Sequence, residues 1–143
     1  AVFCDVGLLG LPDHVVEAGE EQNGAEGQLY YQHAQLGWEF FHRPDEDVPL
    51  LRYASEIALW HHKNADGSGF PWDAAGDAAP LSARLVHTAL RIQRYLHYYQ
   101  GCADIYDRML RALKGESGVN IDPELCRMVE RWKDSLRPAF HAL

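Results

Sequence analysis

The sequence has no long hydrophobic run, few cysteines and little positive charge. No apolar segment approaches the roughly 20 residues that a membrane-spanning helix needs, and the first residues lack the basic and apolar regions of a signal peptide. The three cysteines are widely spaced, which favours reduced thiols and a cytoplasmic protein. The net charge of -8 argues against general nucleic-acid binding, which requires clustered Lys and Arg.

The sequence also lacks strand patterns, internal repeats and low-complexity segments. Its 143 residues, 47% hydrophobic and 24% charged, are typical of one soluble globular domain over residues 1–143. Apolar residues recur at helical spacing instead, as in the stripe of Leu29, His33, Leu36 and Phe40. We therefore predict an all-α bundle of about five helices, without a sheet. The expected helices cover about 26–42, 47–62, 81–99, 105–114 and 123–132.

The most informative stretch is HHKNADGSGFP, residues 61–71. The adjacent His61 and His62 fall at the end of a predicted helix, where both imidazoles can reach one site. The following glycines and proline cannot extend a helix, because glycine favours tight turns and proline lacks an N–H donor. This pattern of a helix that delivers imidazoles to a stiff loop indicates a metal site.

This run resembles the H-H-x-x-x-D-G-x-G-Y-P signature of the HD-GYP family, with Phe70 in place of the tyrosine. Other stretches resemble family motifs in the same order, from about Phe3 to Trp132. They are CDVGLLGLPD (4–13) for H-D-I-G-K-I-G-I-P-D, HAQLG (33–37) for H-x-x-x-G, PLSARL (80–85) for P-L-S-A-R-I and IDPEL (121–125) for F-D-P-E-L.

The resemblance implies an HD-domain-like helical bundle and the chemistry of bacterial, metal-dependent phosphodiesterases that degrade cyclic di-GMP. It implies that Asp5, His33, His61 and His62 are the catalytic metal ligands, for one or two ions of iron, manganese or zinc. In the family, helices with further ligands precede the first motif, and these first helices are missing from residues 1–143. Cyclic di-GMP is the implied ligand.

The resemblance also implies a role for the loop after the histidines, which in the family is implicated in contacts with diguanylate cyclase domains. The interaction loop would comprise Asp66, Gly67, Gly69, Phe70 and Pro71. Asp66 has two equally weighted interpretations, as a turn residue or as a group that orients a ligand histidine. A partner can also be a second copy of the chain, since Tyr95, Tyr98 and Tyr99 surround one predicted helix.

Three departures from the family pattern affect the expected activity. Cys4 replaces the first-motif histidine, and it is either a thiolate ligand or a small buried residue. Leu8 replaces a lysine, and Leu90 stands where the family has a ligand aspartate. Since these losses weaken one metal position, we predict a degenerate, weakly active or inactive regulatory or protein-interaction domain. The alternatives are a metal-dependent cyclic di-GMP phosphodiesterase and a dimerisation domain with core histidines.

Overall fold

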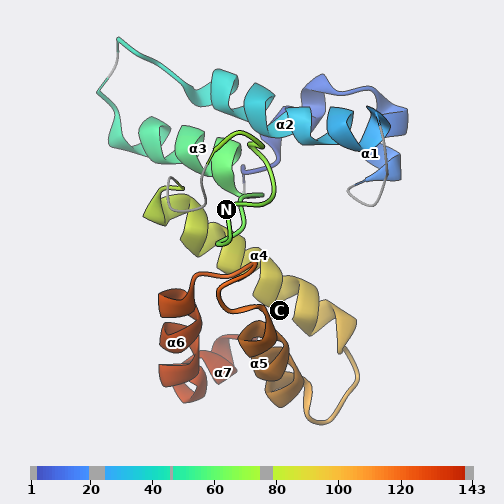
Figure 1. Ribbon diagram of the computed structural model, residues 1–143, viewed down its shortest axis with the longest axis vertical. Coiled ribbons are helices and arrows are strands. Elements are labelled where there is room, and N and C mark those ends of the chain that lie inside the picture. Colours follow the sequence, from blue (N-terminus) through green and yellow to red (C-terminus); the bar gives the residue numbers. More distant parts are fainter. Residues whose placement is uncertain (1–2, 20–24, 46, 75–78, 141–143) are drawn as a thin grey trace.

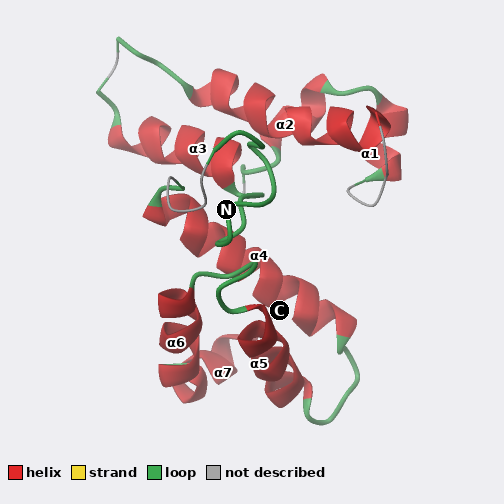
Figure 2. Ribbon diagram, viewed as in Figure 1, coloured by secondary structure: helices red, strands yellow, loops and turns green. Residues whose placement is uncertain are grey.

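The computed structural model describes residues 3–19, 25–45, 47–74 and 79–140, and this part of the chain is all-α (Figures 1 and 2). It contains no β-strand, apart from an isolated bridge between Ser117 and Ile121. The predicted all-α class is therefore confirmed. The elements are η1 (Val6–Gly10), α1 (Asp13–Ala18), α2 (Ala25–Phe41), α3 (Pro49–Trp60), α4 (Leu81–Tyr98), α5 (Ile105–Glu116), α6 (Pro123–Arg131) and α7 (Lys133–Phe140).

The five predicted helices correspond to α2 to α6, with one correction that concerns the site. The helix expected over residues 47–62 begins at Pro49 and ends at Trp60, so His61 and His62 lie just beyond it. Proline suits the first turn because its missing N–H has no helical partner there. At the other end, Lys63 N donates to Trp60 O at 2.9 Å, a tighter turn that ends the helix.

Three short helices were not predicted. η1, α1 and α7 have five, six and eight residues. Such lengths give too few turns for apolar periodicity to stand out. η1 contains part of the first motif and begins directly after Asp5.

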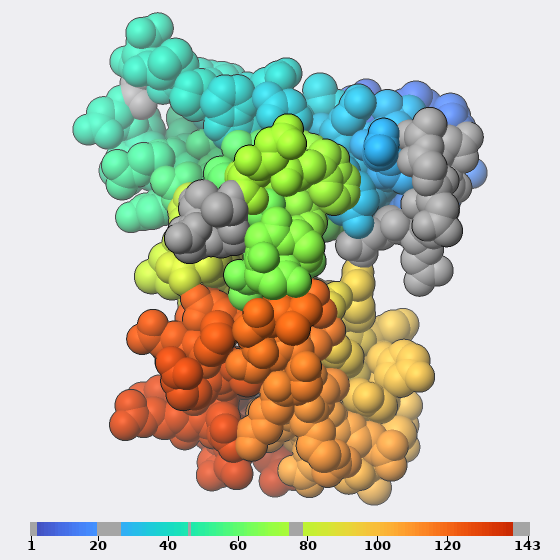
Figure 3. All heavy atoms as spheres, viewed as in Figure 1, coloured from blue at the N-terminus to red at the C-terminus, as the bar shows by residue number. Residues whose placement is uncertain are grey.

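α4 joins the two ends of the structure (Figure 1). η1, α1, α2 and α3 form one end, where α3 contacts α4, and α5, α6 and α7 form the other, where α5 and α6 contact α4. The loop after α3 provides a second connection, because Ala65 N and Asp66 N donate to the carbonyls of Asn120 and Val119 at 3.3 and 2.9 Å. Figure 3 shows this loop in green on the surface between the two ends.

The core near α5 is made of apolar residues at helical spacing, whereas some large apolar residues of other helices lie outside the core. Met109 and Leu113 are buried, together with Ile92, Ile121 and Cys126. By contrast, Phe40, Leu50 and Leu85 are exposed. The buried face of α4 comprises Ala83, His87, Thr88 and Ile92. Helical spacing alone could not select this face, because α4 contacts different helices along its length.

Small residues allow η1 and α3 to lie directly against α2. A Cβ atom on Gly7 would be 1.9 Å from His33 O, which no neighbouring backbone could accommodate without moving. A Cβ atom on Gly37 would be 3.1 Å from the Cβ of Ala58. These approaches bring the start of η1 and the end of α3 to the middle of α2.

No helix within the described residues is both long and apolar enough to cross a membrane. This finding agrees with the sequence, in which no long apolar run was found.

We predict that Gly7→Ala lowers the free energy of unfolding by about 1–3 kcal/mol or more, since the added methyl group displaces η1 from α2. Gly115→Ala is the matched control, because a Cβ there meets nothing within 4 Å. It should leave stability unchanged or raise it slightly. Urea denaturation followed by circular dichroism measures both. Equal midpoints for Gly7→Ala and the unmodified chain would contradict the close approach.

Candidate metal centre

The four predicted ligands, Asp5, His33, His61 and His62, meet in one place although they come from three segments. Asp5 precedes η1, His33 lies within α2, and the histidine pair follows α3. One ligand atom from each residue lies within 4.8 Å of the other three. The chain therefore brings together a group that could hold a metal ion.

The converging atoms are the Nε2 atoms of the histidines and one oxygen of Asp5. His33 Nε2 lies 3.3 Å from His61 Nε2 and 3.2 Å from His62 Nε2. Asp5 Oδ1 lies 3.5 Å from His33 Nε2 and 3.3 Å from His61 Nε2. Four donor atoms thus surround a common point.

Hydrogen bonds on the far side of two rings fix which nitrogen carries a proton. His33 Nδ1 is 2.6 Å from Tyr30 O, and His61 Nδ1 is 2.9 Å from Ala58 O. Since a carbonyl can only accept, both Nδ1 atoms must be donors. With Nδ1 protonated, each Nε2 either carries a second proton, which it can donate to the Asp5 carboxylate, or offers its lone pair to a metal ion. In either state a cation, a proton or a metal ion, must lie between the Nε2 atoms and the carboxylate to offset the repulsion of their lone pairs.

The chemistry of this donor set fits a transition-metal ion. Neutral imidazole nitrogen suits iron, zinc and manganese, and a carboxylate adds a negative charge. Metal-bound histidines commonly donate their other nitrogen to a backbone carbonyl, as His33 and His61 do. The residues present therefore fit a metal centre, although they do not identify the metal.

The centre is buried on the histidine side and open beside Asp5. His33 and His61 are almost fully buried, whereas the Asp5 side chain is 49% exposed. Hydrogen bonds with His33 and His61 hold the pKa of the Asp5 carboxyl well below its usual range. Asp5 therefore carries its negative charge at any physiological pH, on the side where a ligand can approach.

Cys4 lies beside these ligands but outside the group of converging atoms. Its Sγ donates to Asp5 Oδ2 at 3.1 Å, and burial raises the pKa of the thiol to about 12. The neutral thiol is a donor to the carboxylate, and it would have to lose its proton to act as a metal ligand. In the structure, Cys4 thus supports the orientation of Asp5.

The loop after the histidines is organised around Asp66 and Gly69. Asp66 Oδ1 accepts hydrogen bonds from Ser68 N and Ser68 Oγ at 2.8 and 2.6 Å, which lower the pKa of Asp66. These bonds support the turn interpretation of Asp66. Gly69 has a φ of 79°, and a Cβ there would lie 2.2 Å from His62 O. The loop therefore passes directly against the backbone of His62 before the cis Phe70–Pro71 peptide.

Two residues that the sequence did not assign to the site hold its backbone. Lys63 is buried, and its Nζ donates to Gly69 O and Pro71 O at 3.3 and 2.6 Å, so that it closes the loop. His87 on α4 donates from Nδ1 to His61 O at 2.7 Å, and burial lowers the pKa of its ring. The sequence contains no pattern that predicts the contacts of Lys63 and His87, because both contacts depend on the tertiary structure.

An aromatic wall, formed by Tyr31, Phe70 and Trp72, stands beside His62. The ring of Tyr31 lies 5.0 Å from that of His62 and 5.1 Å from that of Trp72, both nearly perpendicular. Phe70 stacks on Tyr31 at 6.4 Å and lies 5.7 Å from Trp72. The sequence identified Phe70 as a loop residue but gave no sign that Tyr31 would join it.

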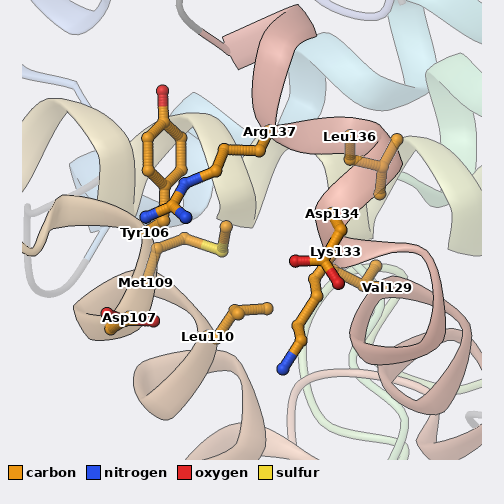
Figure 4. Close-up of a pocket in the computed structure, with 9 residues that line it drawn as sticks. All are labelled: Tyr106, Asp107, Met109, Leu110, Val129, Lys133, Asp134, Leu136 and Arg137. Atoms are coloured by element: carbon orange, nitrogen blue, oxygen red, sulfur yellow. The ribbon is translucent and has the colours of Figure 1, made fainter.

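A separate cavity of about 210 Å³ lies at the other end of the structure, between α5 and the α6–α7 segment (Figure 4). Met109 and Leu110 lie on one side of it, and the guanidinium of Arg137 lies 5.2 Å from the Tyr106 ring centre. None of the predicted site residues lines it. This cavity is therefore distinct from the metal centre.

The all-α fold and the convergence of three histidines with one aspartate place this protein among helical domains with a candidate metal centre. The sequence matches the family described as HD domain over residues 1–125. Because this match covers most of the chain, the chain belongs to the HD-domain family. The predicted fold class and family relationship are both confirmed.

Similar proteins include phosphodiesterases of cyclic dinucleotides. A 3'3'-cGAMP-specific phosphodiesterase 2 of Vibrio cholerae is 29% identical over 136 residues, which cover 91% of this chain and 25% of the relative. A cyclic di-GMP phosphodiesterase of Vibrio cholerae is 31% identical over 78% of this chain and 20% of its own length. One from Thermotoga maritima is 32% identical over 62% of this chain and 24% of its own length. The chain spans at most about a quarter of these relatives.

We predict that His62→Gln greatly reduces the metal bound per chain, because it removes one of four converging ligands. His62 is only half-buried, so the fold should survive the change. His97→Gln, at an exposed position on α4, is the matched control and should retain the metal. Elemental mass spectrometry on anaerobically purified protein measures the content, and circular dichroism verifies folding. Equal metal content in both variants would contradict this centre.

Proposed function

We propose that this HD domain binds one divalent metal ion through Asp5, His33, His61 and His62. We further propose that it acts in cyclic-dinucleotide signalling as a regulatory domain with weak or no hydrolytic activity. The observation that supports this most directly is the convergence of four ligand atoms, with both buried rings fixed in the tautomer that a metal requires.

The buried and exposed residues of the proposed centre have different roles: the buried ones hold the metal, and the exposed one faces an incoming ligand. His33 and His61 are buried and fixed by backbone carbonyls, which makes them rigid ligands. Asp5 is charged and faces solvent, and its second oxygen accepts a hydrogen bond from Cys4 Sγ. A divalent metal in such a site supplies Lewis-acid polarisation of a phosphoryl oxygen and activates water.

The relatives support a cyclic dinucleotide as the ligand class. Their names specify cyclic di-GMP in some cases and 3'3'-cGAMP in others. Both are cyclic dinucleotides with two phosphodiester groups and purine bases. We therefore assign the ligand of this chain to that class without choosing between its members.

Three positions support weak or absent turnover. Cys4 is a neutral donor to Asp5, while Leu8 on η1 and Leu90 on α4 have no ligand atoms. Two-metal hydrolysis clamps both the attacking and the leaving oxygen. A second metal position without these ligands would lose several kcal/mol of transition-state stabilisation, which lowers the rate by orders of magnitude.

The second candidate is an active metal-dependent phosphodiesterase. One observation favours it, namely that the four retained ligands converge with their lone pairs correctly directed. A single metal in such a site can still activate water and polarise a phosphoryl group. The two candidates differ in turnover and agree on metal binding.

Metal content followed by a hydrolysis assay tests the proposal. Protein purified without oxygen or chelators should contain about one metal per chain and bind cyclic di-GMP or 3'3'-cGAMP. Chromatography of single-turnover reactions should then detect slow hydrolysis or none. Turnover at about 1 s⁻¹ or faster would favour the enzyme. A folded protein that takes up neither iron, manganese nor zinc would contradict both candidates.

We predict that the double variant Cys4→His and Leu90→Asp gains activity, since it restores two ligands of the family pattern. Leu90 lies three residues after His87 on α4, and residues at this spacing share a helix face. Because His87 contacts the backbone of His61, this face is directed toward the centre. Metal content should rise above one per chain, and hydrolysis should increase at least about tenfold.

The control for this variant is Cys4→Ala with Leu90→Ala, which changes the same positions without adding ligands. It should retain one metal and show no increase in hydrolysis. An equal increase in both double variants would show that the gain does not come from new ligands.

A further inference from the structure

The aromatic wall joins the candidate metal centre without contributing a ligand. Tyr31 lies on α2 two residues before His33, and Phe70 and Trp72 lie on the loop that passes His62. Two successive edge-on ring contacts, of 5.0 and 5.1 Å, lead from His62 through Tyr31 to Trp72. The wall is therefore continuous with the metal centre.

The loop that carries Phe70 and Trp72 is held in place by hydrogen bonds within the loop and by hydrogen bonds to the turn between α5 and α6. The two hydrogen bonds from Lys63 Nζ to Gly69 O and Pro71 O close the loop at its base. The hydrogen bonds of Ala65 N and Asp66 N attach it to the turn between α5 and α6. Such a wall needs little ordering when a ligand binds, which lowers the entropic cost of recognition.

Trp72 presents an open apolar surface at the end of this wall. Its side chain belongs to the exposed class, at 52% exposure, whereas Tyr31 and Phe70 are half-buried behind it. A large, rigid aromatic surface beside a centre suited to phosphate is the combination with which proteins bind the bases of nucleotides.

We propose that Trp72, supported by Tyr31, stacks against one purine base of a cyclic dinucleotide whose phosphodiester group lies at the metal centre. This inference rests on the proposed function, since it assumes the ligand class given there. The short path from His62 to Trp72 keeps such a base close to the centre.

Stacking predicts a broad specificity at this position. Every base has a π face, so an indole binds guanine and adenine without reading their edges. Trp72 should therefore strengthen the binding of cyclic di-GMP and of 3'3'-cGAMP by similar factors. Discrimination between the two must come from other residues.

The test compares Trp72→Ala, Trp72→Phe and Trp132→Ala in the full chain loaded with manganese. Trp132 is a matched control, because it is 55% exposed and follows α6, away from the metal centre. Titration calorimetry with cyclic di-GMP and with 3'3'-cGAMP gives Kd, and elemental analysis gives the metal content. Trp72→Ala should weaken binding by about 5- to 150-fold for both ligands. Trp72→Phe should retain most of the affinity, and Trp132→Ala should match the unmodified chain.

The outcomes separate this inference from the proposed function. If Trp72→Ala binds metal and dinucleotide as the unmodified chain does, the stacking inference is wrong and the proposed function stands. The exposed indole would then be a candidate contact for a protein partner. If Trp72→Ala loses its metal, the residue acts on the fold of the centre, which also contradicts stacking. If the unmodified chain binds metal but neither dinucleotide, the assigned ligand class fails and the stacking inference fails with it.

Discussion

The hydrogen bonds from His33 Nδ1 and His61 Nδ1 to helix carbonyls determine what the rest of the centre can do. Each carbonyl accepts a proton that the ring must supply, so the lone pair of each neutral ring lies on Nε2. Without a cation, these lone pairs and the Asp5 carboxylate would repel one another at 3.3–3.5 Å. The backbone of α2 and α3 thus orients two buried histidines, which could have been ordinary core residues, as candidate metal ligands.

This geometry requires unusually close packing of the backbone. Gly7 allows η1 to lie against the carbonyl of His33, and this places Asp5 beside both buried rings. On the opposite side, His87 donates to His61 O and ties the end of α3 to α4. Because α4 also packs against α5, the metal centre is mechanically connected to the other end of the structure.

The sequence indicated which candidate ligands would lie together better than it indicated their surroundings. Asp5, His33, His61 and His62 were predicted as ligands because they lie within motifs, and the structure brings all four together. Helix α2 was found because it has enough turns for a periodic pattern, whereas η1 and α1 do not. Contacts such as that of Lys63 with Pro71 O join positions through a loop whose path no local pattern determines. The exposure of Phe40, which belongs to the predicted apolar stripe of α2, was missed for the same reason.

Binding and turnover place different demands on such a centre, which explains how one could persist without the other. Binding needs ligands that hold one cation and a surface that holds the nucleotide, and the four candidate ligands and the aromatic wall are the residues proposed for these two roles. Rapid hydrolysis needs groups that interact more strongly with the transition state than with the bound substrate. Leu8 and Leu90 cannot supply such groups, and Cys4 is committed to Asp5 as a neutral donor. A domain that retains the first set and lacks the second would sense a cyclic dinucleotide far more effectively than it would destroy it.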